Sequence, residues 1–193
     1  MSSHHIVREK QEPALLVMTM DHFNEEYLGQ LLEWSPTILV SAKVAEKVLS
    51  TGIKIDIIIT PENELVNTQE HVKILAAKDD DDILEAALKH LIAEGYPAVN
   101  IITNHFQAKE YLFYVDMIDL VVFDEDKKIY PIKSGFSKWQ TKGEDIYIYH
   151  PEMIHEFSVS GLEKINNNHY QTVKDGFFSF TFEPPFIFIA EQL

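Results

Sequence analysis

The chain of 193 residues contains no cysteine and a single arginine, Arg8, and these two shortages exclude several kinds of site. Without thiolates it has no disulfide framework, no thiolate nucleophile and no zinc site of the cysteine type. Planar, bidentate binding of phosphate is mostly the work of arginine. Any phosphate bound here would therefore depend on lysines, backbone N–H groups or a cation.

Positive charge and long apolar runs are also scarce. The chain has 31 acidic against 16 basic residues and a formal charge of −15, which argues against a nucleic-acid backbone or an anionic membrane surface as the main partner. No apolar run approaches the roughly 20 residues that a membrane helix needs. The polar N-terminal stretch lacks the apolar core of a secretory signal. We therefore expect a cytoplasmic protein that binds neither nucleic acid nor membrane.

Short apolar runs alternate with amphipathic helical stretches in the first part of the chain, up to Asp126. The runs are ALLVMT (14–19), TILVS (37–41), IDIIIT (55–60), VKILAA (72–77), AVNIIT (98–103) and DLVVFD (119–124). Strands separated by helices of this length predict a mostly parallel α/β sheet with helices on both faces. In the helical stretch that follows the fourth run, Leu84, Leu88 and Leu91 share one face, and Gly95 stands where a C-cap is expected.

Beyond Asp126 the pattern changes to short, alternating or aromatic segments with turn residues between them. These segments are KKIYPI, EDIYIYH, EFSVSGL, HYQTVK, GFFSFTFE and FIFIAE. They are typical of an antiparallel β-sandwich or barrel. The sequence thus predicts an α/β domain over residues 1–126 and a β-sandwich domain over residues 127–193.

Ligands of open α/β sheets bind beyond the carboxyl ends of the strands, so the segments after the apolar runs deserve inspection. These segments are Ser41–Lys43, Thr60–Glu64, Lys78–Asp82 and Thr103–His105. The third contains four consecutive aspartates at the start of a helix. They have two interpretations: acids that face the positive end of the helix dipole, or part of a metal and phosphate site.

The order of motifs resembles that of the thiamine pyrophosphokinase family over nearly the whole chain. STGIKIDIIITPENELV resembles the family's helix and strand that lead into the acidic motif GDFDS. KDDDDILEAALKHLIAEG resembles the family's segment that begins K-D-x-T-D-L, and GLEKINNN resembles its Gly-Leu run in the β-domain. The resemblance implies the fold predicted above, transfer of a pyrophosphoryl group from ATP to thiamine with Mg²⁺, and a homodimer.

Several family motifs are altered in this chain. The positions of GDFDS hold Thr60–Glu64, so both aspartates are replaced, by Pro61 and Asn63. An Asp-Gly-Gly turn of the family corresponds to Ala42–Val44. The family's GGR-x-DH motif has only Asn104 and His105 as counterparts. Since magnesium demands near-ideal octahedral geometry, shifted glutamates are poor substitutes for lost aspartates.

The resemblance nevertheless implies a set of candidate site residues. Catalysis is assigned to Asp79, Asp82 and His105, and binding of ATP to Lys78, Asn104 and Glu62. The candidate magnesium ligands are Asp79, Asp82, Glu62 and Glu64. Alignment by the acidic run puts Asp82 on the family's second aspartate, whereas alignment by the helix puts Ile83 there; both alignments stay open.

Thiamine-contacting residues are less well marked, because the family's Ser-Asn-Glu element has no counterpart in TVKDGFFSF. The candidates are Asp175 and Ser179 for polar contacts, and Trp139, Phe177 and Phe178 for stacking or, alternatively, for the core. The sequence favours a thiamine pyrophosphokinase-like protein whose catalysis is reduced, altered or lost. Two alternatives stay open: an authentic enzyme with a rebuilt magnesium site, and a non-catalytic dimer that senses a small molecule.

Overall fold

The computed structural model describes residue 10 and residues 12–21, 23–62, 71–79, 82–150, 154 and 156–193. The chain divides into two compact units, residues 1–120 and residues 121–193. The sequence pattern had predicted the domain boundary at Asp126. We describe each unit separately.

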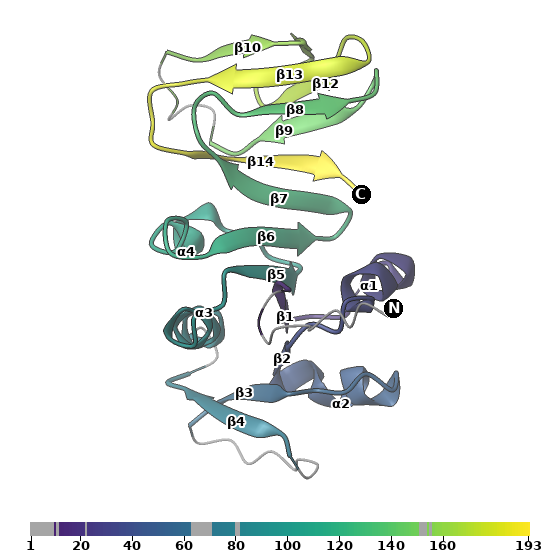
Figure 1. The fold of residues 1–193 in the computed structure, drawn as a ribbon, viewed down its shortest axis with the longest axis vertical. Helices are drawn as coiled ribbons and strands as arrows, with labels where there is room; N and C mark the ends of the chain where they lie inside the picture. Colours follow the sequence, from purple (N-terminus) through teal and green to yellow (C-terminus); the bar gives the residue numbers. More distant parts are fainter. Residues whose placement is uncertain are drawn as a thin grey trace, which may run out of the picture. The chain divides into compact units, whose positions relative to one another are not determined.

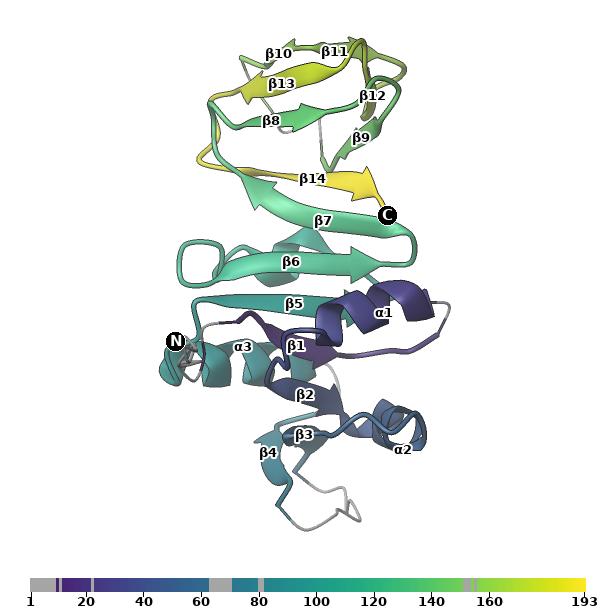
Figure 2. The same cartoon turned by 45° about the vertical axis from the view of Figure 1, so that its right-hand side comes forward.

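Unit 1 is an α/β unit built on a parallel sheet. Its strands are β1 (Ala14–Val17), β2 (Ile38–Ser41), β3 (Ile57–Pro61), β4 (Lys73–Ala77) and β5 (Ala98–Thr103). They lie in the order β5-β1-β2-β3-β4, which is easily followed in Figure 2. Each of the four pairings in this order is parallel. The sequence therefore predicted the parallel sheet of this unit correctly.

Helices cover both faces of this sheet. They are α1 (Glu25–Leu32), α2 (Ala42–Ser50), α3 (Ile83–Ala93) and the short α4 (Ala108–Tyr111). Figure 1 shows α1 and α2 on one face and α3 and α4 on the other. No helix in the described residues is long and apolar enough to cross a membrane.

The predicted face and end of α3 are both confirmed. Leu84, Leu88 and Leu91 are buried. Gly95 has a φ of +78°, and its N–H donates to Ile92 O at 3.0 Å. A glycine fits this left-handed position without a Cβ penalty, so it ends the helix where the pattern indicated.

The strand β4 differs from its neighbours because it forms the edge of the sheet. β1, β2 and most of β3 are buried, whereas Lys73, Ile74 and Ala76 of β4 are exposed. The apolar run VKILAA had predicted a buried strand, and this detail was wrong. An edge strand has a neighbouring strand on one side only, so some of its side chains stay accessible to solvent.

Unit 2 consists of antiparallel strands in two sheets. Its strands are β6 (Asp119–Asp124, which begins two residues before the unit boundary), β7 (Lys127–Ile132), β8 (Ser137–Gln140), β9 (Asp145–Ile148), β10 (Ser158–Ser160), β11 (Leu162–Lys164), β12 (His169–Thr172), β13 (Gly176–Thr181) and β14 (Ile187–Gln192). One sheet has the order β11-β12-β9-β14-β7-β6, and the other has the order β10-β13-β8. The sequence analysis identified segments for each of these strands except β8 and β11, and of β11 only Leu162 lies within a predicted segment.

The core of unit 2 is aliphatic and aromatic, with residues from both sheets. Phe178 and Phe180 of β13 pack with Ile132, Ile146 and Ile189 of the larger sheet. Their rings meet edge to face at 5.8 Å, an arrangement that aromatic pairs prefer. Alternation along β13 places Phe178 and Phe180 inside and leaves Phe177 exposed, as a half-buried strand requires.

Gly161, between β10 and β11, is the glycine that the structure requires most strictly. Its φ is +77°, and a Cβ built there would lie 2.5 Å from Phe177 O. A side chain would thus meet both a strained backbone and the main chain of β13. The Gly-Leu pair that carried the family resemblance in this region therefore has a steric reason.

Candidate functional site at the strand ends of unit 1

Four hydroxyl side chains form a row at the carboxyl edge of the parallel sheet. They are Thr19, Ser41, Thr60 and Thr103, and they are the buried polar residues among the described part of unit 1. Each lies at or just after the end of one of the strands β1, β2, β3 and β5. Open α/β sheets bind ligands at this edge, so the row marks the candidate site.

Two of these hydroxyls are tied to the backbone of the turn that follows them. Thr19 Oγ1 accepts a hydrogen bond from Asp21 N–H at 3.1 Å. Thr103 Oγ1 accepts one from His105 N–H at 3.2 Å. In both turns, therefore, the threonine hydroxyl accepts a hydrogen bond from the backbone N–H two residues further along the chain.

β1 and β5 are neighbours at the point where the chain reverses its direction of winding. From β1 the chain proceeds to β2, β3 and β4 on one side, and β5 then lies on the other side of β1. Met18 N–H donates to Ile102 O at 2.9 Å, so the two strand ends stay together. A crevice at such a reversal point is the usual ligand site of these sheets.

The other two hydroxyls have weaker or no contacts of this kind. Thr60 Oγ1 donates to Pro61 O only at 3.5 Å, the limit of a hydrogen bond. Ser41 is the N-cap residue of α2, and its side chain makes no capping hydrogen bond. These two side chains are therefore the polar groups of the row that are least satisfied by the protein itself.

The structure brings Glu62, Lys78 and Asp79 to neighbouring strand ends. Glu62 N–H donates to Ala77 O at 2.9 Å, which joins the end of β3 to the end of β4. Lys78 and Asp79 follow directly, and all three residues are exposed. The candidate magnesium ligand Glu64 lies outside the described residues.

Asp82 is the N-cap residue of α3, one turn beyond Asp79. Asp82 N–H donates to Asp79 O at 3.3 Å, and Asp82 O accepts from Ala86 N–H at 2.8 Å. Its carboxylate makes no capping hydrogen bond to the helix. The Asp82 carboxylate therefore does not cap α3 by a hydrogen bond, although Asp82 does lie at the start of the helix, where the dipole is positive.

Asn104 and His105 lie at the other side of the sheet, after β5. Three strands separate β5 from β4, and four spacings of about 4.8 Å place the two strand ends about 19 Å apart. His105 is exposed, and its Nε2 contacts the Gln107 side-chain amide. His105 and Asp79 can therefore serve one ligand only if that ligand extends along the whole edge.

The described residues do not fit the magnesium ion that the resemblance implies. Among them, no three histidine, aspartate or glutamate side chains gather closely enough to hold a metal ion. Glu62 and Asp79 follow the ends of the neighbouring strands β3 and β4. Two carboxylates do not provide the nearly octahedral set of oxygen ligands that Mg²⁺ needs. No step below is therefore assigned to a metal.

One ion pair spans two of the segments at this edge. Lys47 Nζ of α2 donates to Asp21 Oδ1 at 2.7 Å, and both side chains are about half exposed. An exposed pair of this kind contributes little to stability, about 0.2–1 kcal/mol. Its main effect is local, because it offsets the charge of Asp21 beside the last turn of α2.

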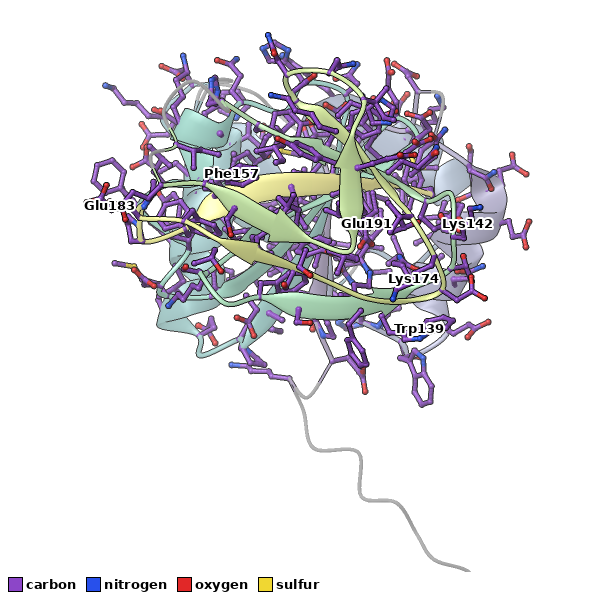
Figure 3. All side chains as sticks on the ribbon, turned by 90° about the horizontal axis from the view of Figure 1, so that it is seen from above. Trp139, Lys142, Phe157, Lys174, Glu183 and Glu191 are labelled. Atoms are coloured by element: carbon purple, nitrogen blue, oxygen red, sulfur yellow. The ribbon has the colours of Figure 1, made fainter. Side chains whose placement is uncertain are left out.

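The aromatic candidates of unit 2 separate into core and surface. Phe178 is buried in the core. Trp139 and Phe177 are 52% and 70% exposed and stand opposite each other in the register of β8 and β13. Figure 3 shows the Trp139 side chain pointing away from the ribbon. The two exposed rings are available to a partner or ligand, whereas Phe178 is not.

The polar candidates of unit 2 are placed differently from each other. Asp175 Oδ1 accepts a hydrogen bond from Lys142 N–H at 2.8 Å, so it fixes the turn between β8 and β9. Ser179 lies in β13 and is half-buried. Neither observation assigns these residues to a ligand.

A buried polar cluster in unit 2 is satisfied internally. Glu191 is 7% exposed, and its carboxylate accepts hydrogen bonds from Tyr130 Oη at 2.8 Å and from Lys138 Nζ at 2.7 and 2.5 Å. These residues come from β14, β7 and β8, so the cluster ties the two sheets together. Burial, together with the Glu191 carboxylate, raises the pKa of the Tyr130 phenol and keeps it a donor.

Thr19, at the end of the first apolar run, is the residue of the row that lies outside the segments predicted from the sequence. A signal was present in the sequence. Four of the six apolar runs, ALLVMT, TILVS, IDIIIT and AVNIIT, end in a hydroxyl residue. The run VKILAA, which forms the exposed edge strand, does not. A terminal hydroxyl therefore marks the strand ends that meet at the site.

Comparison with known proteins finds similarity at the level of structure alone. No protein-family model matches the chain, and no curated protein sequence matches it. Thiamine pyrophosphokinase from Bacillus subtilis superposes with a TM-score of 0.63 at 14% identity, over 94% of this chain and 99% of that one. The thiamin pyrophosphokinase from Geobacillus thermodenitrificans gives a TM-score of 0.66 at 12% identity, over 93% and 96%.

A eukaryotic structure gives the same result. Thiamin pyrophosphokinase from Candida albicans has a TM-score of 0.63 at 8% identity, over 93% of this chain and 90% of that one. The similarity extends over almost the whole length of each protein, so it concerns both units. The chain therefore has the fold of the thiamine pyrophosphokinases of known structure.

Proposed function

We propose that the protein is a thiamine pyrophosphokinase-like protein that binds a phosphorylated small molecule at the strand ends of unit 1. The family reaction, ATP and thiamine to thiamine diphosphate and AMP, is reduced, altered or lost. The observation that carries the proposal is the row of buried hydroxyls, Thr19, Ser41, Thr60 and Thr103, at the carboxyl edge of the sheet. Hydroxyl groups at this edge can donate hydrogen bonds to the oxygens of a phosphorylated ligand and accept them from its hydroxyl groups.

Reduced catalysis follows from the residues that stand where phosphoryl transfer needs charge. Transfer requires a cation held by fixed carboxylates and donors for the charge that develops. Pro61 ends β3 and carries no carboxylate, and Asn104 and His105 lie about 19 Å from the end of β4. These residues support ligand binding better than chemistry.

A thermal shift screen tests the binding part of the proposal. The full chain is heated with ATP, thiamine and thiamine diphosphate, each with and without Mg²⁺. A ligand that binds only the folded state at about 100 times its Kd stabilises it by about 2.7 kcal/mol, so Tm rises by several degrees. If none of these compounds raises Tm at millimolar concentration, the proposal fails.

The catalytic part is tested by the release of AMP from ATP in the presence of thiamine. We expect little or no thiamine diphosphate from the unmodified protein. Formation at a normal rate would favour the alternative of an authentic enzyme, in which Glu62, Glu64, Asp79, Asp81 and Asp82 supply the magnesium site. Recovery of AMP release in the double variant Pro61→Asp/Asn63→Asp would identify an enzyme that has lost its acids.

We further propose that the protein is a cytoplasmic homodimer, in which unit 2 acts as the thiamine-binding-like domain. The exposed Trp139 and Phe177 support an interface or ligand surface in this unit, because aromatic residues are enriched at interface cores. A non-catalytic sensor would keep this dimer. Sedimentation at micromolar concentration tests the assembly, and a monomer would contradict it.

A further inference from the structure

The strand β4 forms an edge of the parallel sheet. It is the last strand in the order β5-β1-β2-β3-β4, and among the described residues no strand pairs with its outer side. Lys73 N–H donates to Asp56 O at 2.9 Å, so Lys73 bonds toward β3. The direction of the backbone groups alternates along a strand, so Ile74 and Ala76 direct their N–H and C=O groups outward. These are the groups that another strand would use.

The side chains of β4 divide between its two faces with the same alternation. Lys73 and the half-buried Leu75 belong to the face that packs against α3. Burial and, after it, the charge of Lys73 lower the pKa of His90 in α3, which agrees with this placement. Ile74 is 44% exposed on the opposite face, and Ala76 on that face is exposed as well. The edge therefore presents an apolar side chain together with its outward backbone groups.

Few features of β4 protect this edge against pairing. Edge strands are normally blunted by proline, bulges or charged side chains. Lys73 is the one charged residue of the strand and stands at its first position, and the four residues that follow are aliphatic, without proline. A lone exposed isoleucine would need no explanation. An isoleucine on an edge strand with outward backbone groups is what strand addition requires.

The charges beside β4 indicate which partner fits the edge. The exposed Lys73 begins the strand, and the exposed Asp79 follows two residues after its last residue, Ala77. Antiparallel pairing brings the end of one strand beside the beginning of the other, so two copies of β4 would bring these opposite charges together twice. Parallel pairing would instead place like charges side by side. The edge thus complements itself, and its charges favour a second copy of this chain.

We propose that β4 pairs with β4 of a second copy, antiparallel and about a two-fold axis at Leu75, so that two unit 1 sheets form one continuous sheet. In this register Ile74 lies opposite Ala76 of the second copy in a hydrogen-bonded pair, and the two Leu75 residues form a non-hydrogen-bonded pair. A strand of five residues makes a small interface, so the association is weak and increases with concentration. This interface lies in unit 1 and is separate from the unit 2 surface of the homodimer proposed above.

The absence of cysteine makes the register directly testable. In Leu75→Cys the two thiols would belong to residues whose Cα atoms are about 4.5 Å apart, a distance that a disulfide can span. We expect mild oxidation of this variant to give a covalent dimer on a non-reducing gel. Lys73→Cys is the matched control on the same face of the same strand. Its two thiols would be about 13 Å or more apart, so it should give several times less covalent dimer.

Sedimentation at increasing protein concentration tests the contact without a new thiol. Ile74→Lys adds a charge to the outward position, and Ala76→Pro removes an outward N–H in a strand whose edge position tolerates proline. We expect the unmodified protein to double its mass between micromolar and near-millimolar concentration, and both variants to lose this step. Ile165→Lys changes an isoleucine of unit 2 that is 51% exposed, and it should keep the step. Melting curves confirm that each variant is folded.

Exchange of the two charges tests the antiparallel direction. Lys73→Asp and Asp79→Lys should each weaken the association about threefold or more, because like charges would then meet twice across the two-fold axis. The double variant Lys73→Asp/Asp79→Lys should restore it, since opposite charges meet again. Failure of the double variant to recover would overturn the antiparallel arrangement.

The remaining outcomes separate this interface from other occupants of the edge. Equal cross-linking of Leu75→Cys and Lys73→Cys would mean random collision and overturn the proposal. A loss of Tm in Ile74→Lys that is the same at every concentration would mean that the edge is covered within one copy, and would also overturn it. If Leu75→Cys does not cross-link while the protein sediments as a dimer that Ile74→Lys leaves intact, this inference fails and the homodimer stands. A monomer at every concentration would contradict both.

Discussion

The two units bury polar groups for different purposes. In unit 2, Glu191 and Thr172 have complete sets of protein partners: the carboxylate accepts from Tyr130 and Lys138, and the Thr172 hydroxyl donates to Thr141 O and accepts from Glu144 N–H. In unit 1, the buried hydroxyls lie at one edge, and Ser41 has no such partner. Polar burial thus stabilises the fold in unit 2, whereas in unit 1 it lies at the strand ends, where we propose that a ligand binds.

This difference explains which parts of the family resemblance persist. A polar group that holds sheets together is constrained by the fold itself, as is a glycine whose Cβ would strike the main chain. A polar group at a strand end that has no protein partner is not constrained in this way. Mutations in the two units should therefore affect different measurements, stability in unit 2 and ligand binding in unit 1.

The largest effect on stability is expected from Gly161→Ala in unit 2. The new Cβ would lie 2.5 Å from Phe177 O, and the backbone would keep a φ of +77°. Strain and overpacking together should cost about 3–4 kcal/mol in the free energy of unfolding. Urea denaturation followed by fluorescence measures this cost.

Gly143→Ala is the matched control for that variant. Gly143 has a similar φ of +88° but nothing near the position of a Cβ. It should therefore lose only about 1 kcal/mol from backbone strain. Equal losses in the two variants would show that the close approach of β13 to Gly161 is unimportant.

The next largest effect is expected from Glu191→Ala. Removal of the carboxylate leaves the Tyr130 hydroxyl without its acceptor, whereas Lys138 is 35% exposed and can turn toward water. We expect a loss of about 2–3 kcal/mol in the free energy of unfolding. Glu163→Ala, which removes an exposed acid of β11, should change it by less than about 0.5 kcal/mol. A loss as small as that control would mean that the cluster is not a structural tie.

The sequence predicted the fold well because the spacing of apolar residues reflects which side chains of a strand or helix face the core. The run 98–103 coincides with β5, and the run 119–124 coincides with β6. The strand β8 was missed because SKWQ contains three polar residues and an exposed tryptophan, so nothing in its composition indicates a buried strand. The exposure of β4 was missed because an apolar run does not reveal whether a neighbour lies on each side.

The candidate site was predictable in location and much less so in geometry. The rule of strand ends led to Ser41–Lys43, Thr60–Glu64 and Thr103–His105, and the row of hydroxyls lies within or beside these segments. Strand order could not be read from the sequence. Only the order β5-β1-β2-β3-β4 shows that His105 and Asp79 stand at distant ends of the edge.

Removal of a buried hydroxyl should change the free energy of unfolding less than Glu191→Ala does, and by different amounts in the two units. Thr172→Val in unit 2 removes a hydroxyl with two partners at 2.6 and 2.8 Å and should cost about 1–2 kcal/mol. Ser41→Ala in unit 1 removes a hydroxyl without a partner and should leave the free energy of unfolding within about 0.5 kcal/mol.

The same two variants should differ in the opposite sense when the response to ligand is measured. The Tm increase produced by pyrophosphate should shrink for Ser41→Ala and stay unchanged for Thr172→Val, because only Ser41 lies at the strand ends where we propose that a phosphorylated molecule binds. Melting curves with and without pyrophosphate measure both quantities at once. A large loss of stability in Ser41→Ala without ligand would contradict the distinction between the two units.

The smallest effect is expected from the ion pair on the surface of unit 2. His169 Nε2 lies 2.7 Å from Asp145 Oδ1, and this hydrogen bond lowers the pKa of the Asp145 carboxyl below its ordinary value of 3.8. A carboxyl whose pKa is lower in the folded state stabilises the protein above its unfolded pKa and loses that contribution as pH falls through the folded value. The contribution should thus be complete at pH 5, begin to fall near pH 3.8 and vanish only below the lower pKa of the folded state.

Asp145→Asn tests this contribution, because it removes the titrating group and keeps the shape of the side chain. The urea midpoint of the variant should be slightly lower than that of the unmodified protein at pH 5, and the two should converge as pH falls below about 3.8. Glu183→Gln, which removes an exposed acid after β13, should show no such convergence. A gap that stays constant down to pH 2.5 would mean that Asp145 acts through packing or through its bond from Gln171 Nε2 rather than through its charge.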